Sequence, residues 1–141
     1  MADLEGSAFR LEFAAQPEFI STARLFAAAV ARHFGCDEDD VQDVKVGISE
    51  ACTNAVKAHL DSVVSEPIAV VVRPAESRLE FNVVDSGGGF SGDRAKPVSS
   101  DLDTHGESGI GIHIIRALFP DAAVANVNGG TSVRFSVKRD L

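Results

Sequence analysis

The sequence predicts an α/β (α+β) two-layer sandwich, in which a mixed, mostly antiparallel sheet of about five strands carries about three helices on one face. Two observations lead to this fold class. Alternating and helically spaced segments follow one another in the order strand, two helices, two strands, loop, helix, two strands. The outward positions of several strands are polar, which is typical of a sheet with one open face. With 141 residues, the range 1–141 is expected to be a single domain.

The N-terminal part of the chain predicts one strand and two helices. Residues 9–15 (FRLEFAA) alternate apolar and polar side chains, as a half-buried strand does. Residues 17–35 begin with proline and end with glycine, the order in which these residues mark the two ends of a helix. Residues 37–60 open with four acidic side chains, which suit the positive end of a helix dipole, and continue with an apolar stripe at helical spacing.

A hairpin follows these helices. Residues 67–74 are nearly all apolar and residues 78–85 alternate, with a short turn between the two predicted strands. The two-residue period places Asp85 on the same side as the buried side chains of its strand. A carboxylate there needs a partner, because burying an unpaired charge is costly.

The C-terminal part predicts a loop, a helix and a second hairpin. Residues 86–108 are rich in Gly, Ser and Asp, and a loop of this length in a compact domain is usually functional or mobile. Residues 111–119 predict a short apolar helix that ends before a proline. Two strands, at 122–127 and 131–139, flank an NGG turn.

The composition argues against two classes of partner. The net charge is −8 and the pI about 4.8. Nonspecific binding to nucleic acid or to anionic membranes requires positive surface, so neither is expected as a direct partner. The acidic N-terminus lacks the apolar core of a signal peptide, and no apolar run could span a bilayer, so a cytoplasmic location is expected. Cys36 and Cys52 lack the spacing of a zinc site and are expected to be reduced, buried thiols.

Glu50 and Asn54 lie four residues apart and therefore share one face of the second predicted helix. Asparagine is a poor residue in a helix interior, because its side chain competes for backbone hydrogen bonds. Taken alone, the pair is more consistent with a solvated face than with chemistry. Gly47 is expected on the same face, where glycine costs about 1 kcal/mol relative to alanine, and it indicates that something approaches the helix backbone closely.

The segment DSGGGF, residues 85–90, has the character of a nucleotide-base site. The Asp85 carboxylate can accept a hydrogen bond from an exocyclic amine. The glycines that follow, Gly87 and Gly89 among them, let a planar ring lie against the backbone. A flexible turn would explain the same segment equally well when it is considered alone.

The segment GESGIGIHII, residues 106–115, has the character of a phosphate site. Gly106, Gly109 and Gly111 precede and open a helix, with Ser108 as the expected N-cap. Free N–H groups and partial positive charge at a helix N-terminus bind phosphate well. Glycines selected for close packing are the competing explanation.

The order of these segments resembles the Bergerat-type ATP-binding fold of histidine kinases, gyrase, Hsp90 chaperones and mismatch-repair ATPases. EACTN matches the E-x-x-x-N box of that fold, and DSGGGF matches its Asp-Gly-x-Gly box. GESGIGIHII matches the second glycine box, and GGTSVRF the closing Gly-Thr strand. The short chain and the wording SEACTNAVKAH resemble the bacterial anti-sigma-factor serine kinases of sporulation and general-stress switches, and this resemblance covers roughly residues 8–139.

The resemblance implies roles for individual residues, with ATP and Mg²⁺ as the cofactors. It implies that Glu50 is the catalytic base, which takes the proton of the attacking serine hydroxyl. It also implies a set of nucleotide contacts: Asn54 holding Mg²⁺ with the ATP phosphates, Asp85 binding the adenine amine, Gly87 and Gly89 beside the ring, Gly106, Ser108, Gly109, Ile110 and Gly111 at the phosphates, and Thr131 supporting the adenine end.

The resemblance also implies partners. The protein would bind and inhibit a sigma factor, and would phosphorylate a serine of an anti-anti-sigma protein of the STAS type. It would work as a homodimer, and the first helix around Arg24 resembles the partner-contact surface of the family. Two alternatives remain: a binding module of the same fold without catalysis, and a detached sensor-kinase ATPase domain that phosphorylates a histidine in trans.

Some residues depart from the pattern or have no assigned role. Lys57 stands where family members carry an apolar residue, one turn past Asn54, and is expected either to be solvated or to touch phosphate. The expected ATP lid contains Arg94, Lys96 and His105, any of which could reach a phosphate. The remaining histidines have no partner visible in the sequence and are expected to be structural or surface residues: His33, His59 and His113.

Overall fold

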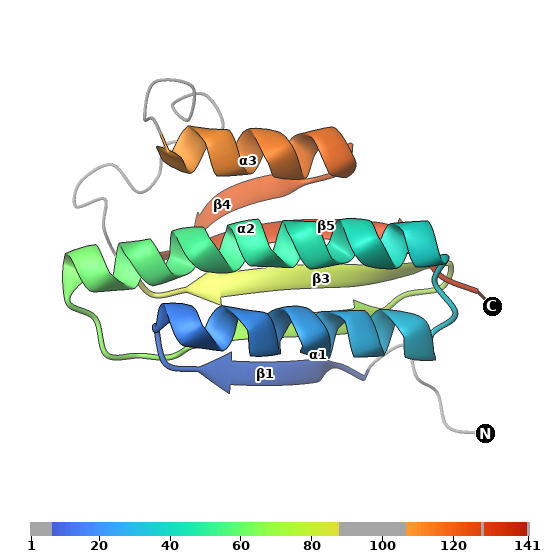
Figure 1. The fold of residues 1–141 in the computed structure, drawn as a ribbon, viewed down its shortest axis with the longest axis horizontal. Helices are drawn as coiled ribbons and strands as arrows, with labels where there is room; N and C mark the ends of the chain where they lie inside the picture. Colours follow the sequence, from blue (N-terminus) through green and yellow to red (C-terminus); the bar gives the residue numbers. More distant parts are fainter. Residues whose placement is uncertain (1–6, 88–106, 128, 141) are drawn as a thin grey trace.

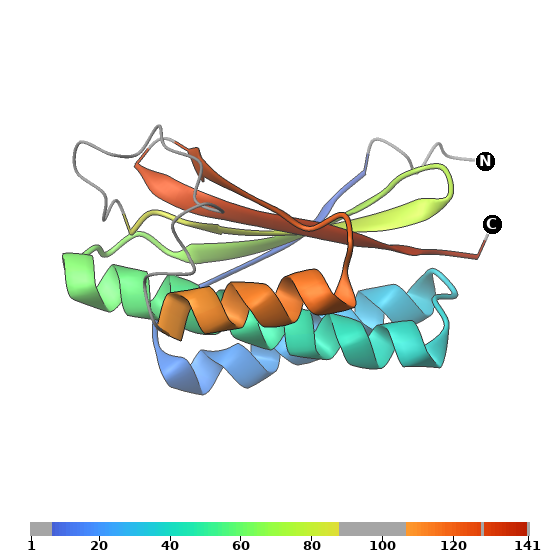
Figure 2. The ribbon, with the colours of Figure 1, turned by 90° about the horizontal axis from the view of Figure 1, so that it is seen from above.

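The structure is a computed structural model that describes residues 7–87, 107–127 and 129–140. Its helices cover one face of a five-stranded sheet, so the predicted two-layer sandwich is confirmed (Figure 2). The elements are β1 (Phe9–Phe13), the 3-10 turn η1 (Pro17–Phe19), α1 (Ile20–His33), α2 (Glu38–Ser62), β2 (Ile68–Pro74), β3 (Arg78–Asp85), α3 (Glu107–Leu118), β4 (Ala123–Val127) and β5 (Gly130–Lys138).

The strands lie in the order β1-β2-β3-β5-β4, and all four pairings are antiparallel. The sheet is therefore antiparallel throughout, where the sequence predicts a mixed, mostly antiparallel one. Between β1 and β2 the chain reverses direction at β1–α1, at α1–α2 and at α2–β2, and an odd number of reversals makes the two strands antiparallel (Figure 1). The unit β3-α3-β4 does produce two strands of the same direction, but β5 lies between them and pairs with both.

Helix α2 is the central helix of the covering layer, with α1 on one side and α3 on the other (Figure 1). Its predicted apolar stripe is confirmed, because every member is buried against the sheet: Val41, Val44, Ile48, Cys52 and Ala55. The inward side chains of β3 meet this stripe, and Phe81 stacks on Phe135 of β5 at a centroid distance of 5.4 Å. The central position of α2 places its two flanks against α1 and α3.

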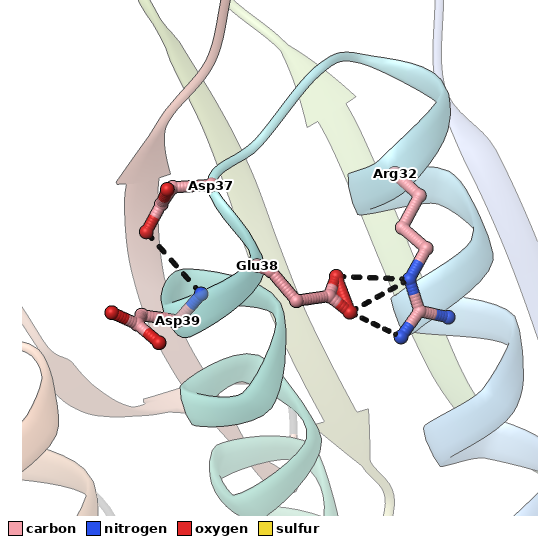
Figure 3. A network of polar contacts seen from close by, with 4 residues as sticks. All are labelled: Arg32, Asp37, Glu38 and Asp39. Atoms are coloured by element: carbon pink, nitrogen blue, oxygen red, sulfur yellow. Dashed lines mark hydrogen bonds and ion pairs between the residues drawn. The ribbon is translucent and has the colours of Figure 1, made fainter.

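The start of α2 is fixed by two polar contacts (Figure 3). The side chain of Asp37 accepts a hydrogen bond from the backbone N–H of Asp39 at 3.2 Å, which satisfies one of the free donors of the first turn. Arg32, in the last turn of α1, pairs with Glu38 at 2.8 Å. These contacts hold the short connection between α1 and α2 and fix where α2 begins.

Within the described ranges, no helix is both long enough and apolar enough to cross a membrane.

Candidate functional site

Glu50 and Asn54 face the N-terminal half of α3. Both side chains are half-buried. A Cβ atom built on Gly111 of α3 would lie 3.0 Å from Nδ2 and 3.4 Å from Oδ1 of Asn54, and 3.3 Å from Oε1 of Glu50. The acid, the amide and the second glycine segment, which are separate in the sequence, therefore meet at one place between α2 and α3.

The two side-chain oxygens of this cluster suit a hard divalent cation. Oε1 of Glu50 lies 3.3 Å and Oδ1 of Asn54 lies 3.4 Å from the point beside Gly111 where a Cβ atom would stand, and Nδ2 of Asn54 lies nearer, at 3.0 Å. Carboxylate and amide oxygens are ligands that Mg²⁺ accepts, and this ion commonly takes only one or two protein ligands beside phosphate and water oxygens. Oδ1 of Asn54 is therefore of the chemical type that its predicted role as a Mg²⁺ ligand requires, and the Glu50 carboxylate lies beside it.

Gly47 has a different role from the one the helical wheel suggests. It is buried, and a Cβ atom there would lie 2.7 Å from Cε2 of Phe119 and 3.0 Å from Cζ of Phe135. The two rings stack on each other at 4.1 Å. The predicted close approach to the helix backbone is present, but the approaching groups are core aromatic rings. Glycine at this position is therefore explained by core packing and not by a ligand.

Asp85 ends β3 on the buried side of the sheet, as the alternation of its strand predicts, and is 8% exposed. Its Oδ1 accepts hydrogen bonds from the N–H of Gly87 at 2.9 Å and from the N–H of Thr131 at 3.3 Å. Burial raises the pKa of the Asp85 carboxyl, and the hydrogen bond from Gly87 opposes this rise. The partner that the carboxylate requires is therefore the backbone of β5 and of its own turn.

Gly87 lies directly against α2. A Cβ atom on this glycine would lie 2.6 Å from Cβ of Ala58 and 3.1 Å from its carbonyl carbon. Ala58 is four residues after Asn54, about 6 Å further along the helix axis. The turn that follows Asp85 therefore contacts α2 about one helical turn beyond Asn54. One elongated ligand could contact both Asp85 and the Glu50–Asn54 pair.

His59 is a residue of this region that sequence reasoning missed. Its side chain is 1% exposed, and its Nε2 accepts a hydrogen bond from the N–H of Ser86 at 2.8 Å. The signal was present in the spacing, because His59 continues the buried stripe two turns after Cys52 and one turn after Ala55. A polar ring at an apolar position of that stripe indicates a specific buried partner.

The start of α3 differs from its prediction. The helix begins at Glu107, so Ser108 lies inside the first turn and is not the N-cap. A carboxylate in the first turn suits the helix dipole, which favours this earlier start. The backbone of Gly109 and Ile110 is helical, and Gly111 is buried against α2. Other predicted residues lie outside the described ranges: Gly89, Gly106, Arg94, Lys96 and His105.

A second opening lies on the other flank of α2. It is a groove of about 360 Å³ to which α1 contributes Arg24, and α2 contributes Gln42, Lys45, Val46, Ser49 and Glu50. The Nε atom of Arg24 is buried and has no hydrogen-bond partner within the described residues. Glu50 therefore borders both this groove and the space beside Gly111, whereas Asn54 does not line the groove.

The cysteines carry no chemistry in this arrangement. Burial raises the pKa of Cys52 to about 12 and that of Cys36 to about 11, so both thiols stay protonated near neutral pH. Both are free thiols, as predicted, although Cys36 is only half-buried.

The fold and the two clusters define a nucleotide-binding domain of the histidine kinase-like ATPase class, whose family model matches residues 13–137. The chain belongs to this family, on its branch of RsbW-type serine-protein kinases. It is 34% identical to serine-protein kinase RsbW of Bacillus thuringiensis (strain Al Hakam) over 127 residues, which are 86% of this chain and 79% of the relative. The RsbW of Bacillus velezensis is 31% identical over the same shares.

A solved structure has the same fold. The crystal structure of the RsbU and RsbW domains of a Mycobacterium tuberculosis protein superposes with a TM-score of 0.67 at 21% identity. The match covers 94% of this chain and 32% of that longer one, so this chain spans about a third of its length. At this identity the likeness concerns the fold alone.

Proposed function

We propose that this protein is an anti-sigma factor and a serine-protein kinase, which binds and inhibits a sigma factor and uses Mg-ATP to phosphorylate a serine of a STAS-type anti-anti-sigma protein. The observation that carries the proposal is the position of Glu50. Oε1 of its carboxylate borders the space shared with Asn54 and Gly111, and the residue also lines the open groove between α1 and α2. A base in this position is within reach of both a nucleotide phosphate and an incoming protein side chain.

The nucleotide would bind along α2. Asp85 would accept the hydrogen bond of the adenine amine, with Gly87 beside the ring and Thr131 supporting that end. The phosphates would lie toward Asn54 and the start of α3, where the backbone N–H groups of Ser108 and Gly109 belong to the first turn of the helix. Asn54 would hold Mg²⁺, which supplies neutralisation of phosphate charge.

The chemical step would use Glu50 as the base. The serine hydroxyl of the substrate protein would enter from the groove, and its oxygen would bond to the γ-phosphorus of ATP. The bond between that phosphorus and the β,γ-bridging oxygen would break, ADP would leave, and the hydroxyl proton would pass to the Glu50 carboxylate. Positioning and charge neutralisation account for most of such a reaction, so a small domain suffices.

The protein partners would use the helical layer. Arg24 lines the groove, and its guanidinium would pair with an acceptor on a docked protein. In its unphosphorylated form the antagonist would compete for this surface and release the sigma factor. We propose a homodimer as the working assembly and the cytoplasm as its location.

The test is transfer of labelled phosphate from ATP to the cognate antagonist. Glu50→Gln should lower the transfer rate by about 10²- to 10⁴-fold, the usual contribution of a positioned base, while ATP binding persists. Asp61→Asn is the matched control, because it removes an exposed carboxylate from the same helix. Transfer of labelled phosphate by the Glu50 variant at the parental rate would refute the kinase assignment.

The two alternatives give different results in the same assay. A binding module without catalysis would bind the sigma factor and transfer no phosphate from any variant. A detached sensor-kinase domain would give an acid-labile phosphohistidine, whereas phosphoserine is stable in acid.

A further inference from the structure

Two consecutive residues of the turn after β3, Ser86 and Gly87, contact two consecutive residues of α2, His59 and Ala58. Ser86 donates its backbone N–H to Nε2 of His59 at 2.8 Å, and Gly87 packs against Ala58 so closely that a methyl group would not fit. Asp85, immediately before this turn, carries the carboxylate that the proposed function assigns to the nucleotide base. Whatever holds residues 86 and 87 therefore also sets the direction of the Asp85 side chain.

The hydrogen bond from Ser86 determines the tautomer of His59. A ring nitrogen that accepts an N–H hydrogen bond must carry its lone pair, so the neutral ring has its proton on Nδ1. Within the described residues, Nδ1 is buried and has no partner. A buried donor without a partner costs free energy, and an apolar side chain of similar size would avoid that cost. Stability alone therefore does not explain a histidine at this position.

The remaining contacts of the turn converge on one oxygen of Asp85. Oδ1 accepts hydrogen bonds from the N–H groups of Gly87 and Thr131, while the N–H of Ser86, the residue between Asp85 and Gly87, donates to His59. With Oδ1 engaged in this way, Oδ2 is the oxygen left for a ligand. Without the acceptor on His59, the Ser86 N–H would either compete for the Asp85 carboxylate or have no hydrogen-bond partner.

We infer that His59 is a positioning residue for base recognition: its Nε2 holds the backbone of Ser86 so that Asp85 presents Oδ2 to the amino group of adenine. The inference rests on the proposed ATP-binding function, and adds that base selectivity depends on a residue that does not itself touch the nucleotide. His59 also joins the base end of the site to the helix that carries Glu50 and Asn54. The two ends of the nucleotide would thereby be held at a fixed separation.

The test compares the affinities for Mg-ATP and Mg-ITP, because ITP replaces the 6-amino group by a carbonyl oxygen and keeps the sugar and the phosphates. His59→Leu should reduce the preference for ATP over ITP by about tenfold, mainly by weakening ATP binding. His59→Gln is the conservative control, since its terminal amide oxygen can accept from Ser86 near the position of Nε2, and it should retain most of the preference. A merely structural role would weaken both nucleotides equally.

A measurement on the parent protein tests the geometry even if His59→Leu does not fold. The ¹⁵N spectrum of the His59 ring should show the neutral tautomer with its proton on Nδ1, and the Ser86 amide should exchange slowly with solvent. A proton on Nε2 overturns the inference. So does an unchanged ATP/ITP ratio in a folded His59→Leu protein, and in that case the proposed function stands. A parent that binds neither nucleotide removes the proposed function and the inference with it.

Discussion

The backbone of Gly111 lies so close to Asn54 that a Cβ atom there would be 3.0 Å from Nδ2 of the amide. This contact joins the third helix to the central one at the point where the proposed magnesium and phosphate contacts meet. It also explains a glycine in the interior of α3, where alanine would favour the helix by about 1 kcal/mol. A side chain at this position would need the space that the amide of Asn54 occupies.

Gly111→Ala should therefore weaken nucleotide binding more than it weakens the fold. The new methyl group would displace the Asn54 amide from its position beside Glu50 and lower the affinity for Mg-ATP by about tenfold, the effect of one lost hydrogen bond or ligand contact. Stability should change little, because the gain in helix propensity offsets the crowding. Calorimetric titration with Mg-ATP and thermal unfolding measure the two effects separately.

A second substitution supplies the control for this prediction. In an Asn54→Ala background the group that the methyl displaces is absent, so Gly111→Ala should cause no further loss of affinity. Equal losses in both backgrounds would show that Gly111 acts on the nucleotide directly or through another residue.

The N-cap of the central helix gives a prediction about stability alone. Asp37→Ala removes the acceptor of the Asp39 N–H and should lower the free energy of unfolding by about 1 kcal/mol, while Asp37→Ser should retain most of it. Arg32→Ala, which breaks only an exposed ion pair, should have a smaller effect. Urea denaturation of the three variants checks this order, and a larger loss from Arg32→Ala would contradict it.

Much of this fold could be predicted from the sequence, because each element carries a strong local signal. The periodic stripe of α2 and the alternation of β3 place their buried side chains correctly, Asp85 included. The pairing of the strands was beyond local signals, since the insertion of β5 between β3 and β4 depends on the path of the whole chain. The start of α3 was placed too late for a related reason: Gly109 and Gly111 indicate a loop unless one knows that the Asn54 side chain needs the space.

The sequence predicted which side chains form the candidate site, and the structure adds the residues that fix their positions. Glu50, Asn54 and Asp85 were visible because their chemistry is unusual for their positions. His59 was not, because its partner is a backbone N–H of Ser86, which has no signature in the sequence. The close approach expected at Gly47 is confirmed, but the approaching groups are the core rings of Phe119 and Phe135, because a helical wheel gives the direction of a residue and not the identity of what it meets.

Gly47 yields a prediction whose sign depends on its neighbour. Gly47→Ala gains helix propensity of about 1 kcal/mol but forces a methyl group against the stacked rings of Phe119 and Phe135, at an overpacking cost of about 1–3 kcal/mol. A net loss of up to about 2 kcal/mol is expected. In a Phe119→Leu background, where the nearer ring is absent, the same substitution should be close to neutral or stabilising. Chemical denaturation of the four proteins in this cycle measures the coupling, and additive effects would refute the packing role.

Asp85 links the proposed binding site to the pH dependence of stability. Burial raises the pKa of its carboxyl in the folded state above the value in the unfolded chain. The folded state therefore binds a proton more readily than the unfolded state between these two pKa values. As pH rises through that window the carboxyl ionises in its buried position, and this group's contribution to stability falls.

Asp85→Asn should for this reason lose function while gaining relative stability. The amide oxygen can still accept from Gly87 and Thr131, but its NH₂ group would then face the adenine amine, and the affinity for ATP should fall by about ten- to hundredfold. The difference in unfolding free energy between the variant and the parent should shift in favour of the variant as pH rises from 4 toward 7, because asparagine has no proton to lose. Urea titrations across this range, with Asp61→Asn as the exposed control, measure the shift. A difference that moves toward the parent with rising pH would mean that the ionised carboxylate is stabilised in the fold, and that Asp85 is a structural anchor rather than a group held in an unfavourable state for its ligand.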